Sequence, residues 1–210
     1  MIGIYGGTFD PVHYGHLRTA LEVEEALALE ELRFVPCQIP PHRETPGASA
    51  GQRLRMLRAA LADSEPRLRI DPRELERPGP SYMVDTLESL REELGKVSLG
   101  LILGMDAFLG LTGWHRWEAL FDLAHIVVMQ RPGYRPELVT ELQDRVAGRI
   151  TEQPEPLRAS QSGRVCFVTV TQLEISASRI RQVIASQRSA RYLTPDAVLA
   201  VIREENLYQP

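Results

Sequence analysis

The chain has 210 residues, of which 43% are hydrophobic and 25% charged, a composition typical of one domain with a sizeable core. Its formal net charge of −4 provides no overall attraction to nucleic acid. No apolar run approaches the ~18 residues that a membrane span requires. These properties argue against a nucleic-acid or membrane partner.

The cysteines and the N-terminus indicate the compartment. Cys37 and Cys166 have neither CxxC spacing nor a metal-ligand pattern, so we expect both to be small buried residues in a reducing compartment. The first residues, MIGIYGG, lack a basic region followed by a long apolar run, so no signal peptide is expected. We therefore expect a cytoplasmic protein.

Short β-rich runs alternate with helical patterns along the chain. The apolar run at 97–104 is typical of a central strand of a parallel sheet, because such a strand is covered on both faces. We expect Ser81 and Thr194 to cap helices, Gly95 to end one, and Pro195 to lie in a first turn. In chain order, the predicted elements are a strand at 2–5, a helix at 16–30, a strand at 32–37, a helix at 51–63, an extended segment at 68–75, a helix at 81–95, a strand at 97–104, a helix that begins near 112 or 113, strands at 125–131 and 164–174, and helices at 176–187 and 194–208.

The alternation predicts an α/β fold, a doubly wound and mostly parallel sheet with right-handed crossovers. Such sheets bind ligands beyond the carboxyl ends of the strands, where the strand order reverses. Residues 132–163 are the least regular part, and we expect a surface excursion there. We expect a single domain over 1–210, whose C-terminal helical part, at about 176–208, packs on the sheet.

The segment GGTFDPVHYGH, residues 6–16, connects the first strand to the first helix. Gly6 and Gly7 allow the backbone to approach a ligand closely, and the helix N-terminus after them favours an anion such as phosphate. His13 and His16 are expected on one face, where imidazolium groups could donate to phosphate oxygens and stabilise a transition state. Alternatively, one histidine caps the loop and the other is a metal ligand or a surface residue. The adjacent glycines and the lack of a cysteine or carboxylate trio favour phosphate.

The segment ISASRIR, residues 175–181, follows the last predicted strand. Ser176 or Ser178 can cap the next helix, from whose first turns Arg179 and Arg181 project. Hydroxyl, N–H and guanidinium groups together suit a polyphosphate. The alternative is ordinary capping with solvated arginines.

Two shorter motifs add candidates. In PPHR, His42 and Arg43 lie on a proline-led loop that is either a phosphate contact or a surface turn. In GMD, Gly104 permits close approach of a ligand, and Asp106 could accept from ribose hydroxyls or act as a helix N-cap.

GTFDPVHYGH resembles the signature of the nucleotidylyltransferase superfamily, whose HxGH-type motif is related to the HIGH motif of class I aminoacyl-tRNA synthetases. From Ile4 to about Tyr208, the chain is similar to the bacterial nicotinate-nucleotide adenylyltransferase family. The motifs that carry this resemblance also include PPHR (40–43), SYMVDTL (81–87), GMD (104–106), Trp114, RPG (131–133) and ISASRIR (175–181).

The resemblance implies a Rossmann-like nucleotidylyltransferase fold and a reaction. AMP would pass from ATP, with Mg²⁺, to nicotinate mononucleotide, giving nicotinate adenine dinucleotide and pyrophosphate in NAD synthesis. The metal would be held mainly by phosphates and water, and no protein ligand to it is expected. Two alternatives remain: another phosphorylated acceptor (nicotinamide mononucleotide or phosphopantetheine), or a non-catalytic nucleotide sensor.

The resemblance also assigns residues. His16 would act at the α-phosphate as the main catalytic residue, His13 would help to hold the phosphates, and Arg181 would hold the β- and γ-phosphates. Ser178 stands where threonine is common, and the hydroxyl is kept. The implied ATP site comprises Gly6, Gly7, Thr8, Phe9, His13, His16, His42, Arg43, Gly104, Asp106, Ser176, Ser178, Arg179 and Arg181.

The implied acceptor site comprises Tyr82, Thr86, Trp114, His115 and Arg131. Tyr82 and Thr86 are expected on one helix face, Trp114 would stack on the pyridine ring, and the nearby Trp117 is an alternative core residue. His115 replaces a tyrosine that is common in the family. The free N–H groups of the helix expected near 112 or 113 would bind the nicotinate carboxylate, and Arg116 is the nearby cation.

Overall fold

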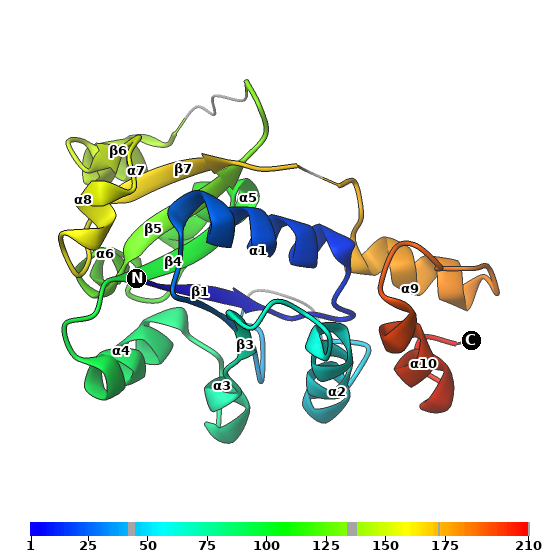
Figure 1. Cartoon of the computed structure of the whole chain (residues 1–210). Coiled ribbons are helices and arrows are strands. Elements are labelled where there is room, and N and C mark those ends of the chain that lie inside the picture. The colour runs from blue at the N-terminus through cyan, green and yellow to red at the C-terminus, as the bar shows by residue number, and fades with distance from the viewer. Residues whose placement is uncertain (42–44, 134–137, 172, 210) are drawn as a thin grey trace.

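In the computed structural model, residues 1–41, 45–133, 138–171 and 173–209 are described. These residues form a seven-stranded sheet in which every strand pairing is parallel, in the order β3-β2-β1-β4-β5-β7-β6 (Figure 1). The predicted doubly wound sheet is thus confirmed. The strands are β1 (Ile2–Gly7), β2 (Glu31–Pro36), β3 (Leu68–Ile70), β4 (Leu99–Gly104), β5 (His125–Gln130), β6 (Ile150–Thr151) and β7 (Val165–Thr169).

Helices cover both faces of the sheet, because alternate residues of its buried strands point to opposite sides. On β4, Ile102 packs in the same core as helices α1, α2 and α10, whereas Leu101 and Leu103 pack with α4, α5 and α6. The helices are α1 (Tyr14–Leu27), α2 (Ala50–Leu61), α3 (Arg73–Glu76), α4 (Met83–Leu94), α5 (Met105–Leu109), α6 (Leu120–Leu123), α7 (Thr140–Val146), α8 (Glu155–Arg158), α9 (Ala177–Ala185) and α10 (Asp196–Glu204).

The two C-terminal helices lie at one end of the molecule. Figure 1 shows α9 and α10 together beyond the start of α1, with α10 next to α2. Val198 and Ile202 of α10 share a buried cluster with Met56 and Leu57 of α2. No helix of the described residues is long and apolar enough to cross a bilayer.

Several local predictions are wrong, and each error has a tertiary cause. The Ser81 hydroxyl accepts from the backbone N–H of Gln38 instead of capping α4, whose N-cap is Tyr82. The Thr194 hydroxyl donates to the Val12 carbonyl, and Pro195 is itself the N-cap of α10.

Other differences concern the extent of the elements. The extended segment at 68–75 ends in the short helix α3, and the expected surface excursion at 132–163 contains α7, α8 and the edge strand β6. In contrast, Gly95 ends α4 at a φ of 62°, as predicted.

Candidate active site

A cavity of about 1160 Å³ opens beyond the carboxyl ends of β1 and β4. Because β1 pairs with β2 on one side and β4 on the other, this is where the strand order reverses. The predicted residues that line the cavity are Gly6, Gly7, Thr8, Phe9, His13, His16, Tyr82, Gly104, Asp106, Trp114, His115, Arg131, Ser176, Ser178 and Arg181.

The remaining predicted residues lie elsewhere. Thr86 and Arg179 are not among the residues that line the cavity. His42 and Arg43 fall outside the residues that the structure describes.

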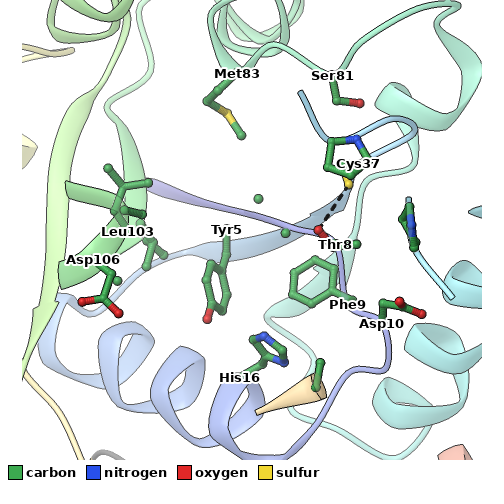
Figure 2. A pocket seen from close by; sticks show the side chains of 18 of the residues that line it. Tyr5, Thr8, Phe9, Asp10, His16, Cys37, Ser81, Met83, Leu103 and Asp106 are labelled. Carbon is green, nitrogen blue, oxygen red and sulfur yellow. Dashed lines mark hydrogen bonds between the residues drawn. The ribbon is translucent and has the colours of Figure 1, made fainter. Parts of the chain in front are cut away.

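Packing against the Phe9 ring requires the glycine at position 7, whereas the contact at Gly6 is with the flexible end of a methionine. A Cβ at Gly7 would lie 2.8 Å from the ring of Phe9, and one at Gly6 would collide with the side chain of Met83. Phe9 itself is buried and has a φ of 51°. Thr8 accepts a 3.7 Å hydrogen bond from the thiol of Cys37 (Figure 2). The tight turn is thus held by neighbouring side chains.

His13 and His16 meet at the start of α1. His13 is the helix N-cap, but its side chain makes no capping bond. Its ring stacks on that of His16, with centroids 3.7 Å apart. The His16 ring in turn packs edge-on against Phe9, at 5.2 Å between centroids, as Figure 2 shows. The expected juxtaposition of the two imidazoles is therefore present.

The positive charge expected on His13 is absent in the ligand-free protein. Burial lowers the pKa of His13 to about 4, so the ring is neutral at pH 7. Its Nδ1 is buried and has no hydrogen-bond partner among the described residues. A neutral imidazole still donates one N–H, and a nearby anion would favour its protonation.

The N-terminus of α9 lies against the start of α1. A Cβ at Gly15 would lie 3.4 Å from the carbonyl oxygen of Ile175, one residue before the N-cap of α9. That N-cap is Ser176, which accepts from the N–H of Arg179, so the predicted cap is confirmed. Two helix N-termini thus face one cavity, and both favour an anion.

Arg181 and Ser178 project from the first turns of α9. The guanidinium of Arg181 donates to the carbonyl of Asp10 at 2.7 Å and lies 3.4 Å from the hydroxyl of Ser178. Its side chain is 35% exposed, so it can still contact a ligand. Arg179 is exposed and contributes its backbone N–H to the cap.

The residues after β4 form another side of the cavity. Gly104 is the N-cap of the five-residue helix α5, and a Cβ there would meet nothing within 4 Å. Asp106 lies in the first turn, so it is not the N-cap that we considered. Figure 2 shows its exposed carboxylate across the pocket from Asp10, where it can accept from a ligand's hydroxyls.

Aromatic side chains gather where the acceptor was expected. The rings of Tyr82 and His115 lie 4.4 Å apart, and Trp114 lines the cavity beside them. Trp117 is buried and packs edge-on against Phe121, so it belongs to the core. Tyr82 and Trp114 are partly buried and His115 is exposed, so a flat ring could stack on these side chains.

The helix expected near 112 or 113 is absent. The chain makes two 3₁₀ turns there, Leu111–Gly113 and Trp117–Ala119, separated by an extended Trp114 and a left-handed Arg116 with a φ of 51°. The Arg116 guanidinium pairs with Glu88 on the surface at 2.8 Å. The expected helix N-terminus is therefore absent, and Arg116 is paired on the surface.

Thr86 is fully buried behind the cavity wall. Its hydroxyl donates to Glu74 at 2.6 Å and accepts from Arg77 at 3.0 Å. Tyr82 is the N-cap of α4, so Tyr82 and Thr86 do not share a helix face as expected. Burial raises the pKa of Glu74, which lines the cavity. The sequence did not predict Glu74 as a cavity residue, because nothing in its neighbourhood distinguishes it from a surface glutamate.

The fold and this site define a nucleotidylyltransferase-type α/β protein. The family described as cytidylyltransferase-like matches residues 4–183.

Curated relatives narrow the class. The chain is 57% identical to the "Probable nicotinate-nucleotide adenylyltransferase" of Methylococcus capsulatus over 99% of both chains. It is 51% identical to the protein of the same name from Pseudomonas aeruginosa, over 99% of this chain and 97% of that one. The chain belongs to the nicotinate-nucleotide adenylyltransferase family.

Solved structures share the fold. Nicotinic acid mononucleotide adenylyltransferase of Plasmodium falciparum, complexed with NaAD, matches with a TM-score of 0.76 at 17% identity, over 99% of this chain and 96% of that one. A complex of the same protein with APC gives a TM-score of 0.73 at 16% identity, with the same coverage.

Proposed function

We propose that this chain transfers AMP from ATP to nicotinate mononucleotide, releasing pyrophosphate and forming nicotinate adenine dinucleotide. Family membership supports the reaction. The observation that carries the assignment to this cavity is the stacked His13–His16 pair, which shares the cavity with Arg181 and with the aromatic ring of Trp114. One cavity thus offers donors for a triphosphate and a surface for a pyridine ring.

The reaction requires positioning and charge stabilisation. A phosphate oxygen of the mononucleotide attacks the α-phosphorus of ATP, a new P–O bond forms, and the bond to the β-phosphate oxygen breaks. The nucleophile is already an anion, so no general base is needed. His16 would donate to the α-phosphate as charge develops, and His13 would donate beside it.

The leaving pyrophosphate would lie at the start of α9. Ser178 and Arg181 present a hydroxyl and a guanidinium there, and the helix N-terminus adds its N–H groups. Asp106, on the other side of the cavity, would accept from ribose hydroxyls, while Tyr82, Trp114 and His115 would hold the pyridine ring.

Magnesium would arrive as MgATP, bound to phosphate and water oxygens. The described residues contain no group of three His, Cys, Asp or Glu side chains placed to hold a metal ion. The carboxylate of Asp10, which lines the cavity, is already occupied by protein donors. The residues present therefore suit a metal carried by the substrate, which is how Mg²⁺ usually binds with nucleotides.

We also propose that residues 1–210 act as one domain in the cytoplasm. The two main buried clusters lie on opposite faces of the same sheet, and α10 completes one of them. Both cysteines are buried free thiols, which suits a reducing compartment.

Pyrophosphate release from MgATP, assayed separately with three acceptors, tests the function. Release that depends on nicotinate mononucleotide supports the proposal. Release only with nicotinamide mononucleotide or phosphopantetheine would assign another acceptor, and nucleotide binding without release would indicate a sensor.

A further inference from the structure

Asp10 links three parts of the chain beside the cavity. Its carboxylate accepts from the backbone N–H groups of Gly47 at 2.8 Å and Ala48 at 3.1 Å, and from the hydroxyl of Tyr208 at 2.7 Å. Its carbonyl accepts from Arg181 at 2.7 Å. One residue of the opening loop thus holds the segment before α2, the first turns of α9 and the C-terminal tail.

The carboxylate of Asp10 is buried, 4% exposed: Oδ1 accepts from Ala48 and Tyr208, and Oδ2 accepts from Gly47. The guanidinium of Arg181 lies 3.5 Å from it, farther than from the Asp10 carbonyl. Arg181 therefore makes its short hydrogen bond with the neutral carbonyl, while its ion pair with Oδ2 of the carboxylate is longer. The donors that bind the carboxylate compete with Arg181 for its negative charge. Loss of the Tyr208 donor would leave the carboxylate with more of its negative charge, which would strengthen its attraction for the guanidinium and its repulsion of a polyphosphate.

The ring of Tyr208, near the C-terminus, packs beside Gly47 and Arg181. A Cβ at Gly47 would lie 3.2 Å from the Tyr208 ring and 3.5 Å from Cδ of Arg181, so the ring and the arginine meet over Gly47. Burial and the neighbouring Asp10 raise the pKa of Tyr208, which keeps its phenol protonated as a donor. Arg53 separately holds the same loops, since it donates to the carbonyls of Thr8 and Ala48.

We propose that Tyr208 is a positioning residue for polyphosphate binding: its hydroxyl occupies the Asp10 carboxylate and thereby leaves Arg181 directed at the β- and γ-phosphates. This rests on the proposed function only in taking ATP as the ligand. Tyr208 should contribute to affinity only through the β- and γ-phosphates, so it should contribute nothing to the binding of AMP, which lacks them. Because Arg53 anchors the loops independently, removing the hydroxyl should not unfold them.

The test compares binding of ATP and AMP to the full chain by calorimetry. In Tyr208→Phe, we expect Kd for ATP to rise about tenfold, the scale of one hydrogen bond to a charged group, with Kd for AMP unchanged. Tyr192→Phe is the matched control, because Tyr192 is a 76% exposed residue of the same C-terminal region. Unchanged thermal melting establishes that the fold is intact.

A double-mutant cycle shows whether the effect passes through Arg181. In an Arg181→Met background, Tyr208→Phe should produce no further change in Kd for ATP. Three results would overturn the proposal. Tyr208→Phe could weaken the binding of ATP and AMP equally, it could bind ATP as tightly as the wild-type protein does, or its effect could be undiminished in the Arg181→Met background. If the wild-type protein binds ATP but transfers no adenylyl group, the proposed function is contradicted instead. The two failures are therefore distinguishable.

Discussion

The imidazole rings of His13 and His16 lie 3.7 Å apart, with their planes inclined by only 27°. Two imidazolium ions at this separation would repel each other. Burial holds the pKa of His13 at about 4, so this ring is neutral until an anion arrives. Bound phosphate would offset the cost of protonating it. In the proposed site, the charge of the pair would therefore be coupled to the bound phosphate.

His16→Gln should lower kcat on the order of 10²-fold, because one preorganised donor to the transition state is lost. The amide roughly preserves the contact with Phe9. Pyrophosphate release at saturating substrates measures the effect, and an unchanged thermal melting temperature serves as the control for an intact fold. A kcat within a few-fold of wild type would remove His16 from its assigned role.

His13 should make stability depend on acid pH. Its folded pKa of about 4 lies below the ordinary 6.5, so the unfolded chain binds more protons between these values. Its stabilisation is therefore fully present above pH 6.5 and is lost as the pH falls toward 4. Between pH 7 and pH 5, the free energy of unfolding should fall by about 2 kcal/mol more in wild type than in His13→Gln.

Urea unfolding at the two pH values measures that difference. Burial also lowers the pKa of His125, but this residue is common to both proteins, so its contribution cancels. Identical pH dependence in wild type and variant would mean that His13 is not held neutral in the folded protein.

Replacing Trp114 and replacing Trp117 should have different effects, the first on substrate binding and the second on stability. Trp114→Ala is expected to raise KM for nicotinate mononucleotide about 5- to 150-fold with little change for ATP, because stacking on a ring is worth roughly 1–3 kcal/mol. Trp117→Ala is expected to lower the free energy of unfolding by about 3–5 kcal/mol, since it leaves a hole beside Phe121. Steady-state kinetics and urea unfolding separate the two, and the reverse pattern would exchange their assignments.

Arg116 should not determine the choice between acid and amide. We expect nicotinate mononucleotide to be preferred over nicotinamide mononucleotide, and Arg116→Ala to leave the ratio of their kcat/KM values within about twofold, because the guanidinium pairs with Glu88 on the surface. If Arg116→Ala brings the ratio of the two kcat/KM values close to one, Arg116 must turn inward to bind the carboxylate.

Periodicity and local signals predicted the framework of the fold because they are properties of neighbouring residues. The apolar run that became β4 and the glycine that ends α4 are read directly from the sequence. β6, only two residues long, carries no such pattern. The expected helix near 112 or 113 fails because Trp114 is extended and Arg116 is left-handed.

Contacts between distant residues could not be predicted in this way. Ser81 and Thr194 both look like local caps, yet their partners are Gln38 and Val12. Asp10 lies inside the opening motif, but its partner Tyr208 is 198 residues away. The motif therefore predicted residues that line the candidate cavity, while the contacts that support them could be found only in the structure.

The central claim is adenylyl transfer to nicotinate mononucleotide in the cavity that His16 lines. The most direct measurement is product formation from MgATP and nicotinate mononucleotide, followed by chromatography alongside pyrophosphate release, for wild type and His16→Gln. The account predicts equal amounts of nicotinate adenine dinucleotide and pyrophosphate from wild type, and on the order of 10²-fold slower formation of both by the variant. Pyrophosphate release independent of the mononucleotide, or no dinucleotide from the wild-type protein, would contradict it.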